Sequence, residues 1–210
     1  MTSNLPPSDT ADVFIVDDDP DVRDSVKLLL EAAGFRAEAF DSAKAFLASD
    51  AVKRRGCVVA DIRMPDMDGL ELQEELARRH LPLPIIIVTG HGDVPLAVRA
   101  MKAGAIEFLE KPYNERALIE SVRRGLREAS ALAEERSAAQ ASVDRLATLT
   151  DREREVFGLL VVGHPNKVIA YKLDISPRTV EIHRAHVMEK MHARNLAELI
   201  RMSIAIDTTA

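Results

Sequence analysis

Short apolar runs constrain this chain more than any other feature. Runs of four apolar, mostly β-branched residues occur at 13–16, 57–60 and 85–88, and less regular runs occur at 36–40 and 106–109. Runs without polar alternation fit strands that are buried on both faces, as in a parallel sheet covered by helices. Amphipathic helical patterns separate the runs, near 21–33, 42–51, 69–79, 94–103 and from 115 onward. The sequence therefore predicts an α/β domain with a doubly wound five-stranded parallel sheet.

The rest of the chain carries helical patterns alone. From residue 114 the pattern continues to 146, which favours one long linker helix, with a shorter helix and a flexible tether as the alternative. The resulting division is a first domain at 1–125, a helical linker at 126–145 and an all-α domain at 146–210.

Capping signals divide the all-α part into separate helices. Thr150 and Glu153 form a capping-box pattern that opens a helix ending near residue 162. Ser176 and Pro177 supply an N-cap and a first-turn proline. Further helices are predicted at 166–173, 177–191 and 195–205. The helices at 166–173 and 177–191, joined by a tight turn, form a helix-turn-helix pattern.

Charge is distributed unevenly along the chain. The net charge is −6, and residues 1–125, with 16 basic and 22 acidic side chains, account for all of it. Residues 146–210 carry 9 basic and 8 acidic side chains. Because the charges of residues 146–210 nearly cancel, this segment can still carry a local basic face that binds nucleic acid.

Several features point to the cytoplasm. No apolar run approaches the roughly 18–20 residues that span a bilayer, so we expect no membrane partner. The start of the sequence has neither a basic segment nor an apolar segment of a secretory signal. The single cysteine, Cys57, cannot form an internal disulfide.

Reactive side chains follow four of the five predicted strands. These are Asp17, Asp18 and Asp19 after the first strand, Asp61 after the third, Thr89 after the fourth and Lys111 after the fifth. In an open parallel sheet, functional groups lie beyond the carboxyl ends of the strands. Any one of them alone would be an ordinary solvated loop residue, but four together indicate a site.

The chemistry of this cluster indicates phosphate. Neighbouring carboxylates repel by roughly 4 kcal/mol per close pair at an effective dielectric near 20, so they need a cation. Hard oxygen ligands suit Mg²⁺, which also binds phosphoryl oxygens. A carboxylate can attack phosphorus while a lysine and a hydroxyl neutralise the equatorial oxygens. Asp61, which ends a central strand alone, is the predicted nucleophile.

Several motifs resemble those of the two-component response regulators. Residues 16–20, 61–69, 89–92, 100–105 and 110–112 look like a receiver domain, and residues 149–156, 166–170 and 175–183 look like a LuxR-type DNA-binding domain. The combination resembles the NarL/FixJ family over nearly the whole chain. Residues 90–98 and 165–167 point to the FixJ branch.

The resemblance implies a role for each receiver residue. Asp61 is the phosphoacceptor, and Asp18, Asp61 and the Arg63 backbone carbonyl ligate Mg²⁺, with Asp17 acting through a metal-bound water. Lys111, before a cis bond to Pro112, pairs with the phosphoryl group. Thr89 and Phe108 form the switch pair. Arg63 and His91 occupy positions that tune dephosphorylation in receivers, although exposed loop residues of these types are more often only solvated.

Helical spacing assigns two faces to the segment 177–191. Val180, His183, Val187 and Met191 fall on the face that should be core. The opposite face should enter the major groove, with Arg178 reaching guanine or phosphate and Glu181 accepting from cytosine. The predicted DNA-contacting residues are Lys167, Arg178, Thr179, Glu181, Ile182, Arg184 and Ala185.

The resulting prediction is a phosphorylation-dependent transcription factor. Its implied partners are a sensor histidine kinase, double-stranded DNA and, once phosphorylated, a second copy of the chain. Release of an inhibitory contact between the domains is an alternative route to activation. The FixJ branch implies an oxygen-responsive haem kinase and nitrogen-fixation genes.

Two other functions fit part of the pattern. A haloacid-dehalogenase-like phosphatase would explain Asp17-x-Asp19, but it needs a further acidic pair after Lys111. A receiver with an RNA- or protein-binding helical output is the other alternative, and the capped helix-turn-helix after Ser176 argues against it. We expect no enzyme activity beyond phosphorylation and slow dephosphorylation of Asp61.

Overall fold

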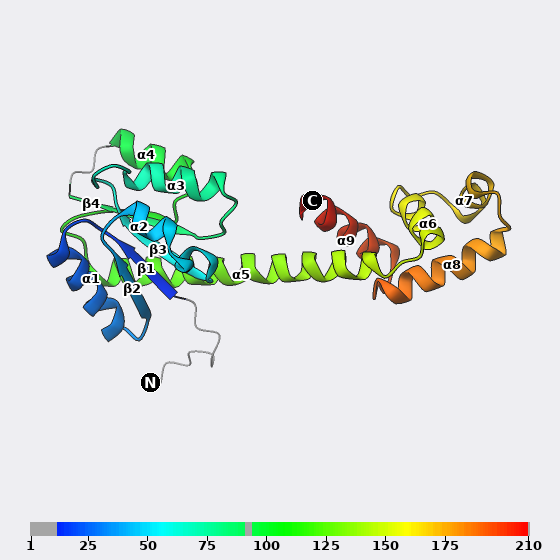
Figure 1. Cartoon of the computed structure of the whole chain (residues 1–210), viewed down its shortest axis with the longest axis horizontal. Coiled ribbons are helices and arrows are strands. Elements are labelled where there is room, and N and C mark those ends of the chain that lie inside the picture. The colour runs from blue at the N-terminus through cyan, green and yellow to red at the C-terminus, as the bar shows by residue number, and fades with distance from the viewer. Residues whose placement is uncertain (1–11, 91–93, 210) are drawn as a thin grey trace. The chain divides into compact units, whose positions relative to one another are not determined.

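The computed structural model describes residues 12–90 and 94–209, so residues 91–93, including His91, lie outside the described part. The chain divides into two compact units, residues 1–133 and 134–210 (Figure 1).

The first unit is built on a five-stranded parallel sheet in the order β2-β1-β3-β4-β5. Neighbouring strands pair in parallel throughout. The strands are β1 (Asp12–Val16), β2 (Arg36–Phe40), β3 (Gly56–Asp61), β4 (Ile85–Thr89) and β5 (Glu107–Glu110). The predicted fold class is confirmed.

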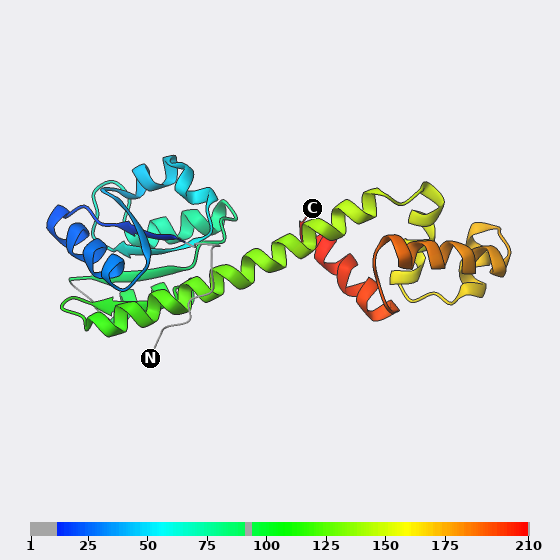
Figure 2. The same cartoon turned by 90° about the horizontal axis from the view of Figure 1, so that it is seen from below.

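Helices bury both faces of this sheet. Alternate strand residues such as Phe14 and Ile87 pack with α2, α3 and α4, while Ile15 and Val88 pack with α1 and α5. Figure 2 shows α1 (blue) and α5 (green) on the near side of the sheet. The helices are α1 (Pro20–Ala32), α2 (Ala43–Ala48), the 3₁₀ turn η1 (Asp50–Lys53), α3 (Gly69–Arg78), α4 (Val94–Lys102) and α5 (Glu115–Ala147).

The single helix predicted over 42–51 is two elements in the structure. Ser49 has extended backbone, and its hydroxyl accepts from the backbone N–H of Ala51. Because Ser49 ends α2 and caps η1 at once, helical periodicity across it is interrupted.

Helix α5 is continuous over 33 residues. It contains no proline, and its only glycine is Gly125. The linker segment is therefore helical, as predicted, and the division between the two units falls inside it. In the described part of the chain, no helix combines the length and apolarity that crossing a bilayer requires.

The second unit packs four further helices around its own core. They are α6 (Asp151–Val161), α7 (Asn166–Leu173), α8 (Pro177–Lys190) and α9 (Leu196–Thr209). Buried side chains at their centre include Val156, Ile169, Val180 and Leu199. Asp174 ends α7 in the left-handed conformation, and Ser176 caps α8. These two features make the tight turn of the predicted helix-turn-helix.

Close approach of α5 to the sheet depends on Gly125. A Cβ atom at this position would lie 2.4 Å from the sulfur of Cys57 and 3.3 Å from its Cβ. Cys57 is fully buried on β3, and burial raises the pKa of its thiol. The glycine therefore provides room for α5 to cover the sheet.

A buried carboxylate joins α6 to α8. Glu153 accepts a hydrogen bond from the backbone N–H of Thr150 at 2.9 Å, and the Thr150 hydroxyl accepts from the N–H of Glu153. The same Glu153 oxygen accepts from the ammonium of Lys190 at 2.6 Å. The hydrogen bond from Lys190 is the main reason that the pKa of Glu153 falls to about 2. The predicted capping box is thus also an interhelical ion pair.

We predict that Gly125→Ala lowers the free energy of unfolding of the first unit by about 1–3 kcal/mol, because the new methyl group meets the Cys57 sulfur. Gly158→Ala in α6 is the matched control, since nothing lies within 4 Å of a Cβ there. That change should stabilise by about 0.5–1 kcal/mol. Denaturant unfolding measures both, and equal effects of the two changes would contradict the packing argument.

We predict that Glu153→Gln weakens the protection of backbone amides in α6 and α8 against hydrogen exchange, and that the size of this effect depends on pH. The folded-state pKa is lowered, so the ionised carboxylate stabilises the fold fully above about 4.5, and this contribution is lost as the pH falls towards about 2. Hydrogen exchange read by mass spectrometry should show less amide protection in the variant than in the wild type at pH 7. This difference in protection should become smaller as the pH falls from about 4.5 towards about 2. A difference that stays constant with pH would show that the charge of Glu153 is unimportant. Glu155→Gln, at an exposed ion pair with Arg152, is the control.

Candidate functional site

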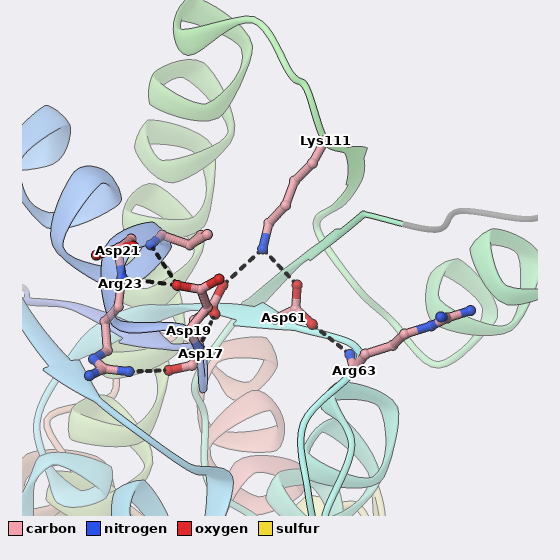
Figure 3. Close-up of polar contacts among 8 residues, drawn as sticks. Asp17, Asp19, Asp21, Arg23, Asp61, Arg63 and Lys111 are labelled. Carbon is pink, nitrogen blue, oxygen red and sulfur yellow. Dashed lines mark hydrogen bonds and ion pairs between the residues drawn. The ribbon is translucent and has the colours of Figure 1, made fainter.

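Two buried carboxylates and one ammonium group meet at the carboxyl edge of the sheet. Lys111 donates to Asp17 at 2.9 Å and to Asp61 at 2.7 Å. The side chains of Asp17 and Asp61 are 8% and 9% exposed. Figure 3 shows Lys111 reaching between the two carboxylates. The bond between Lys111 and Pro112 is cis. We refer to Asp17, Asp61 and Lys111 as the carboxylate site.

Burial and charge oppose each other in this site. Burial raises the pKa of Asp61, and the hydrogen bond from Lys111 offsets only part of that rise. Burial lowers the pKa of Lys111, but its hydrogen bonds to Asp61 and Asp17 outweigh this and leave it raised. Lys111 is therefore a permanent cation, and the Asp61 carboxylate carries a charge that its surroundings only partly neutralise.

The start of α1 positions Asp17. Asp19 caps this helix by accepting from the backbone N–H groups of Asp21 and Val22. The guanidinium of Arg23 donates to the backbone carbonyl of Asp17 at 2.7 Å. Sequence reasoning missed Arg23, because no motif marks a side chain that bonds to a carbonyl. Besides capping the helix, Asp19 donates its backbone N–H to the Asp17 carboxylate at 2.9 Å.

Asp61 is held by the loop that follows it. The backbone N–H of Arg63 donates to Asp61 at 2.6 Å, whereas the Arg63 side chain points away from the site (Figure 3). A Cβ at Gly69 would lie 2.3 Å from the Asp61 carbonyl oxygen. A glycine is therefore needed where α3 begins, because helix and strand touch directly there.

The residues of the site fit a hard cation. Asp17 and Asp61 converge on one positive charge, and exposed Asp18 lies between Asp17 and the capping residue Asp19. Over residues 12–90 and 94–209, no three His, Cys, Asp or Glu side chains gather as a metal cluster. Mg²⁺ keeps several waters and needs only one or two protein carboxylates. The predicted ligands Asp18, Asp61, Arg63 and Asp17 stay a prediction.

The predicted switch residues lie on one face of the sheet. Thr89 is fully buried at the end of β4. Phe108, on β5, pairs with Ile87 on β4. Its ring packs against the hydrophobic core cluster that includes Ala100 of α4. Because side chains alternate along a strand, Thr89 shares the face of Ile87. Both residues therefore lie on the sheet face that α4 covers.

Helix α8 separates a buried face from an exposed one. Val180, Val187 and Met191 are fully buried. Arg178, Glu181, Ile182, Ala185 and Glu189, which the sequence places on the opposite face, are exposed, and Lys167 on α7 is also exposed. Ile182 is 51% exposed, so this predicted contact residue is accessible to a partner.

Three polar residues of α8 have contacts that the sequence did not predict. The Thr179 hydroxyl lies 2.8 Å from that of Ser176. Arg184 donates to Asn166 on α7 at 3.1 Å, and His186 lies 3.6 Å from Glu153. Thr179 and Arg184, expected as phosphate contacts, therefore also make contacts within the domain.

Two family models match the chain. Residues 13–123 match the response regulator receiver domain, and residues 147–203 match the luxR family of bacterial regulatory proteins. The receiver match covers the sheet and the carboxylate site. The luxR-family match covers α6 to α8 and the beginning of α9.

Several characterised proteins resemble the whole chain. The transcriptional regulatory protein FixJ of Rhizobium meliloti (strain 1021) is 49% identical, with 92% of this chain and 95% of that protein covered. FixJ of Bradyrhizobium diazoefficiens is 47% identical, with 91% and 94% covered.

Solved structures of response regulators also resemble this chain over most of its length. The response regulator StyR superposes with a TM-score of 0.77 at 42% identity, covering 93% of this chain and 98% of that one. Full-length FixJ from B. japonicum superposes with a TM-score of 0.55 at 46% identity, covering 94% and 98%. With its receiver fold, carboxylate site and luxR-type helix-turn-helix, the chain belongs to the FixJ-like response regulators of the NarL/FixJ family.

Proposed function

We propose that this protein is a transcription factor that is activated when a sensor histidine kinase transfers a phosphoryl group to Asp61. The observation that carries the proposal is the position of Lys111 between Asp17 and Asp61, within 2.9 Å of both. A fixed cation beside a buried carboxylate is what an aspartyl phosphate requires, because the new phosphoryl oxygens need a positive neighbour.

The proposed transfer begins with attack of an Asp61 carboxylate oxygen on the phosphorus of a phosphohistidine. The new O–P bond forms as the P–N bond breaks, and the imidazole leaves with its electron pair and takes up a proton. Lys111 pairs with the phosphoryl oxygens, and the Thr89 hydroxyl donates one hydrogen bond to them. Asp18, Asp61 and the Arg63 carbonyl would hold Mg²⁺, with Asp17 acting through water, and the bound ion would supply further positive charge. Hydrolysis of the acyl phosphate resets Asp61.

Activation is proposed to act through the sheet face that α4 covers. The phosphoryl group carries about −1.5 to −2 charges in place of the single charge of the Asp61 carboxylate, and it draws Thr89 inward, which lets Phe108 rotate. Helix α4 exposes three apolar side chains, Val94 at 76%, Val98 at 46% and Met101 at 46%. These side chains support a homodimer formed through α4 and α5 of the phosphorylated chain. Release of an inhibitory contact between the domains is the alternative.

The exposed face of α8 is proposed to enter the major groove of an operator. Arg178 would reach guanine or phosphate, and Glu181 would accept from cytosine, with Ile182 and Ala185 beside them. Lys167, Thr179 and Arg184 would contact phosphates, the last two while keeping their contacts within the domain. Dimerisation would place two such helices on two half-sites, which raises affinity steeply.

The biological role is proposed from the relatives. The similarity to FixJ proteins at 47–49% identity supports nitrogen-fixation genes as targets and an oxygen-responsive haem kinase as the phosphoryl source. Since its kinase and its DNA would both be available in the cytoplasm, the protein is proposed to act there, as a regulator and not as an enzyme.

We predict that Asp61→Asn abolishes phosphorylation. Acetyl phosphate with Mg²⁺ should add one phosphoryl group to the wild type, read by intact mass, and none to the variant. Asp66→Asn is the matched control, because Asp66 is exposed in the loop after the same strand and pairs with Lys44. An adduct that persists without Asp61 would contradict the assignment of the nucleophile. Light scattering on the same samples should show dimers only where the adduct forms.

We predict that Arg178→Ala weakens DNA binding by about 1–3 kcal/mol, the value of a direct base contact. The duplex would be one that the phosphorylated wild type selects from a random-sequence pool. Arg201→Ala, at an exposed position on α9, is the control and should bind like wild type. Phosphorylation should be normal in both variants. Retained affinity in the Arg178 variant would remove this residue from the DNA contacts.

A further inference from the structure

Glu153 is a buried charge that neither phosphorylation nor DNA contact uses. Its side chain is 5% exposed, and its partner Lys190 is 36% exposed. One Glu153 oxygen accepts from Lys190 at 2.6 Å, and the other lies 3.6 Å from Nδ1 of His186. Helix α6 is therefore hydrogen-bonded to α8 through Lys190, one turn after His186 and just beyond the segment 178–185 that carries the predicted DNA contacts.

A second polar contact holds the opposite flank of α8. Arg184 donates to Asn166 at 3.1 Å, which ties α8 to the first residue of α7. At about 100° per residue, Arg184 lies on one side of the buried stripe of Val180 and Val187, while His186 and Lys190 lie on the other. The exposed residues Arg178, Glu181 and Ala185 lie opposite the buried stripe, and His186 borders that exposed face. Polar contacts thus lie on both sides of the buried face.

Rotation of α8 about its own axis matters for base recognition. The core contacts of Val180, Val187 and Met191 are non-directional, so burial alone fixes this rotation weakly. Hydrogen bonds to a charged group are short and directional. Because side-chain ends lie about 5–6 Å from a helix axis, a rotation of about 20° moves them by about 2 Å. Such a shift is enough to misalign a bidentate contact to a base.

We infer that Glu153 is a positioning residue for DNA recognition, which fixes the rotation of α8 through Lys190 so that the face bearing Arg178 and Glu181 meets the bases. The inference rests on the proposed function, since it deepens the role of the same exposed face. Glu153 itself touches no DNA in this arrangement. Its effect is on discrimination between sequences, whereas phosphate contacts set the affinity for any duplex.

The test compares two variants that remove either end of the pair. Glu153→Gln keeps an oxygen for the N–H of Thr150 but loses the charge that attracts Lys190, and Lys190→Met keeps the aliphatic stem without the ammonium. Glu155→Gln is the matched control, because it makes the same chemical change in α6 at an exposed ion pair. Each full-length, phosphorylated chain would be titrated with the duplex selected by the wild type and with a scrambled duplex of equal length and composition.

We predict that Glu153→Gln and Lys190→Met each lower the ratio of selected-duplex to scrambled-duplex affinity on the order of tenfold, the cost of one displaced base contact. The double variant should lose no more than the larger single loss, because one pair is removed in all three chains. Glu155→Gln should leave the ratio unchanged. A merely structural role would reduce the folded fraction and weaken both duplexes equally, so the ratio would not move.

Every other outcome overturns the inference. An unchanged ratio in Lys190→Met would overturn it even if Glu153→Gln failed to fold, because Lys190 is partly exposed. An equal drop in Glu155→Gln would also overturn it, since the effect would not belong to the buried pair. If the wild type selects no duplex at all, the proposed DNA-binding function fails and this inference fails with it.

Discussion

One ammonium group between two buried carboxylates is the interaction on which the first unit depends. Asp17, Asp61 and Lys111 each directly follow or end a separate strand, and the parallel arrangement of those strands brings the three residues to one edge of the sheet. Without Lys111, two buried negative charges would face each other at a cost of several kcal/mol. The fold and the chemistry of the site are therefore linked, because the charge that stabilises the resting state is also the charge that a phosphoryl group needs.

Much of this arrangement could be predicted from the sequence. The unalternated apolar runs indicate strands buried on both faces, and the ends of parallel strands meet, so the strand pattern alone places Asp17, Asp61, Thr89 and Lys111 at one edge. The break at Ser49 was missed because periodicity cannot show where a serine side chain replaces a helical hydrogen bond.

Side-chain contacts that join two different elements were the least predictable. Arg23 bonds to a backbone carbonyl, and Lys190 pairs with a glutamate 37 residues earlier in the sequence. Neither contact follows from spacing along one helix, since each depends on how two elements pack. The sequence did show that Glu153 caps α6, but a capping box requires only local contacts. The second use of Glu153 became visible only when α6 and α8 were placed side by side.

The packing of α5 against the sheet has a practical consequence for labelling. Cys57 is the only cysteine in the chain, and it lies fully buried beneath Gly125 with its thiol pKa raised by burial. Thiolate is the form that alkylating reagents attack, so the native sulfur is unreactive while the fold is intact. A cysteine introduced on an exposed helix would then be the one thiol that takes up a spin label or dye. The wild-type background is therefore suited to site-specific labelling without removal of its own cysteine.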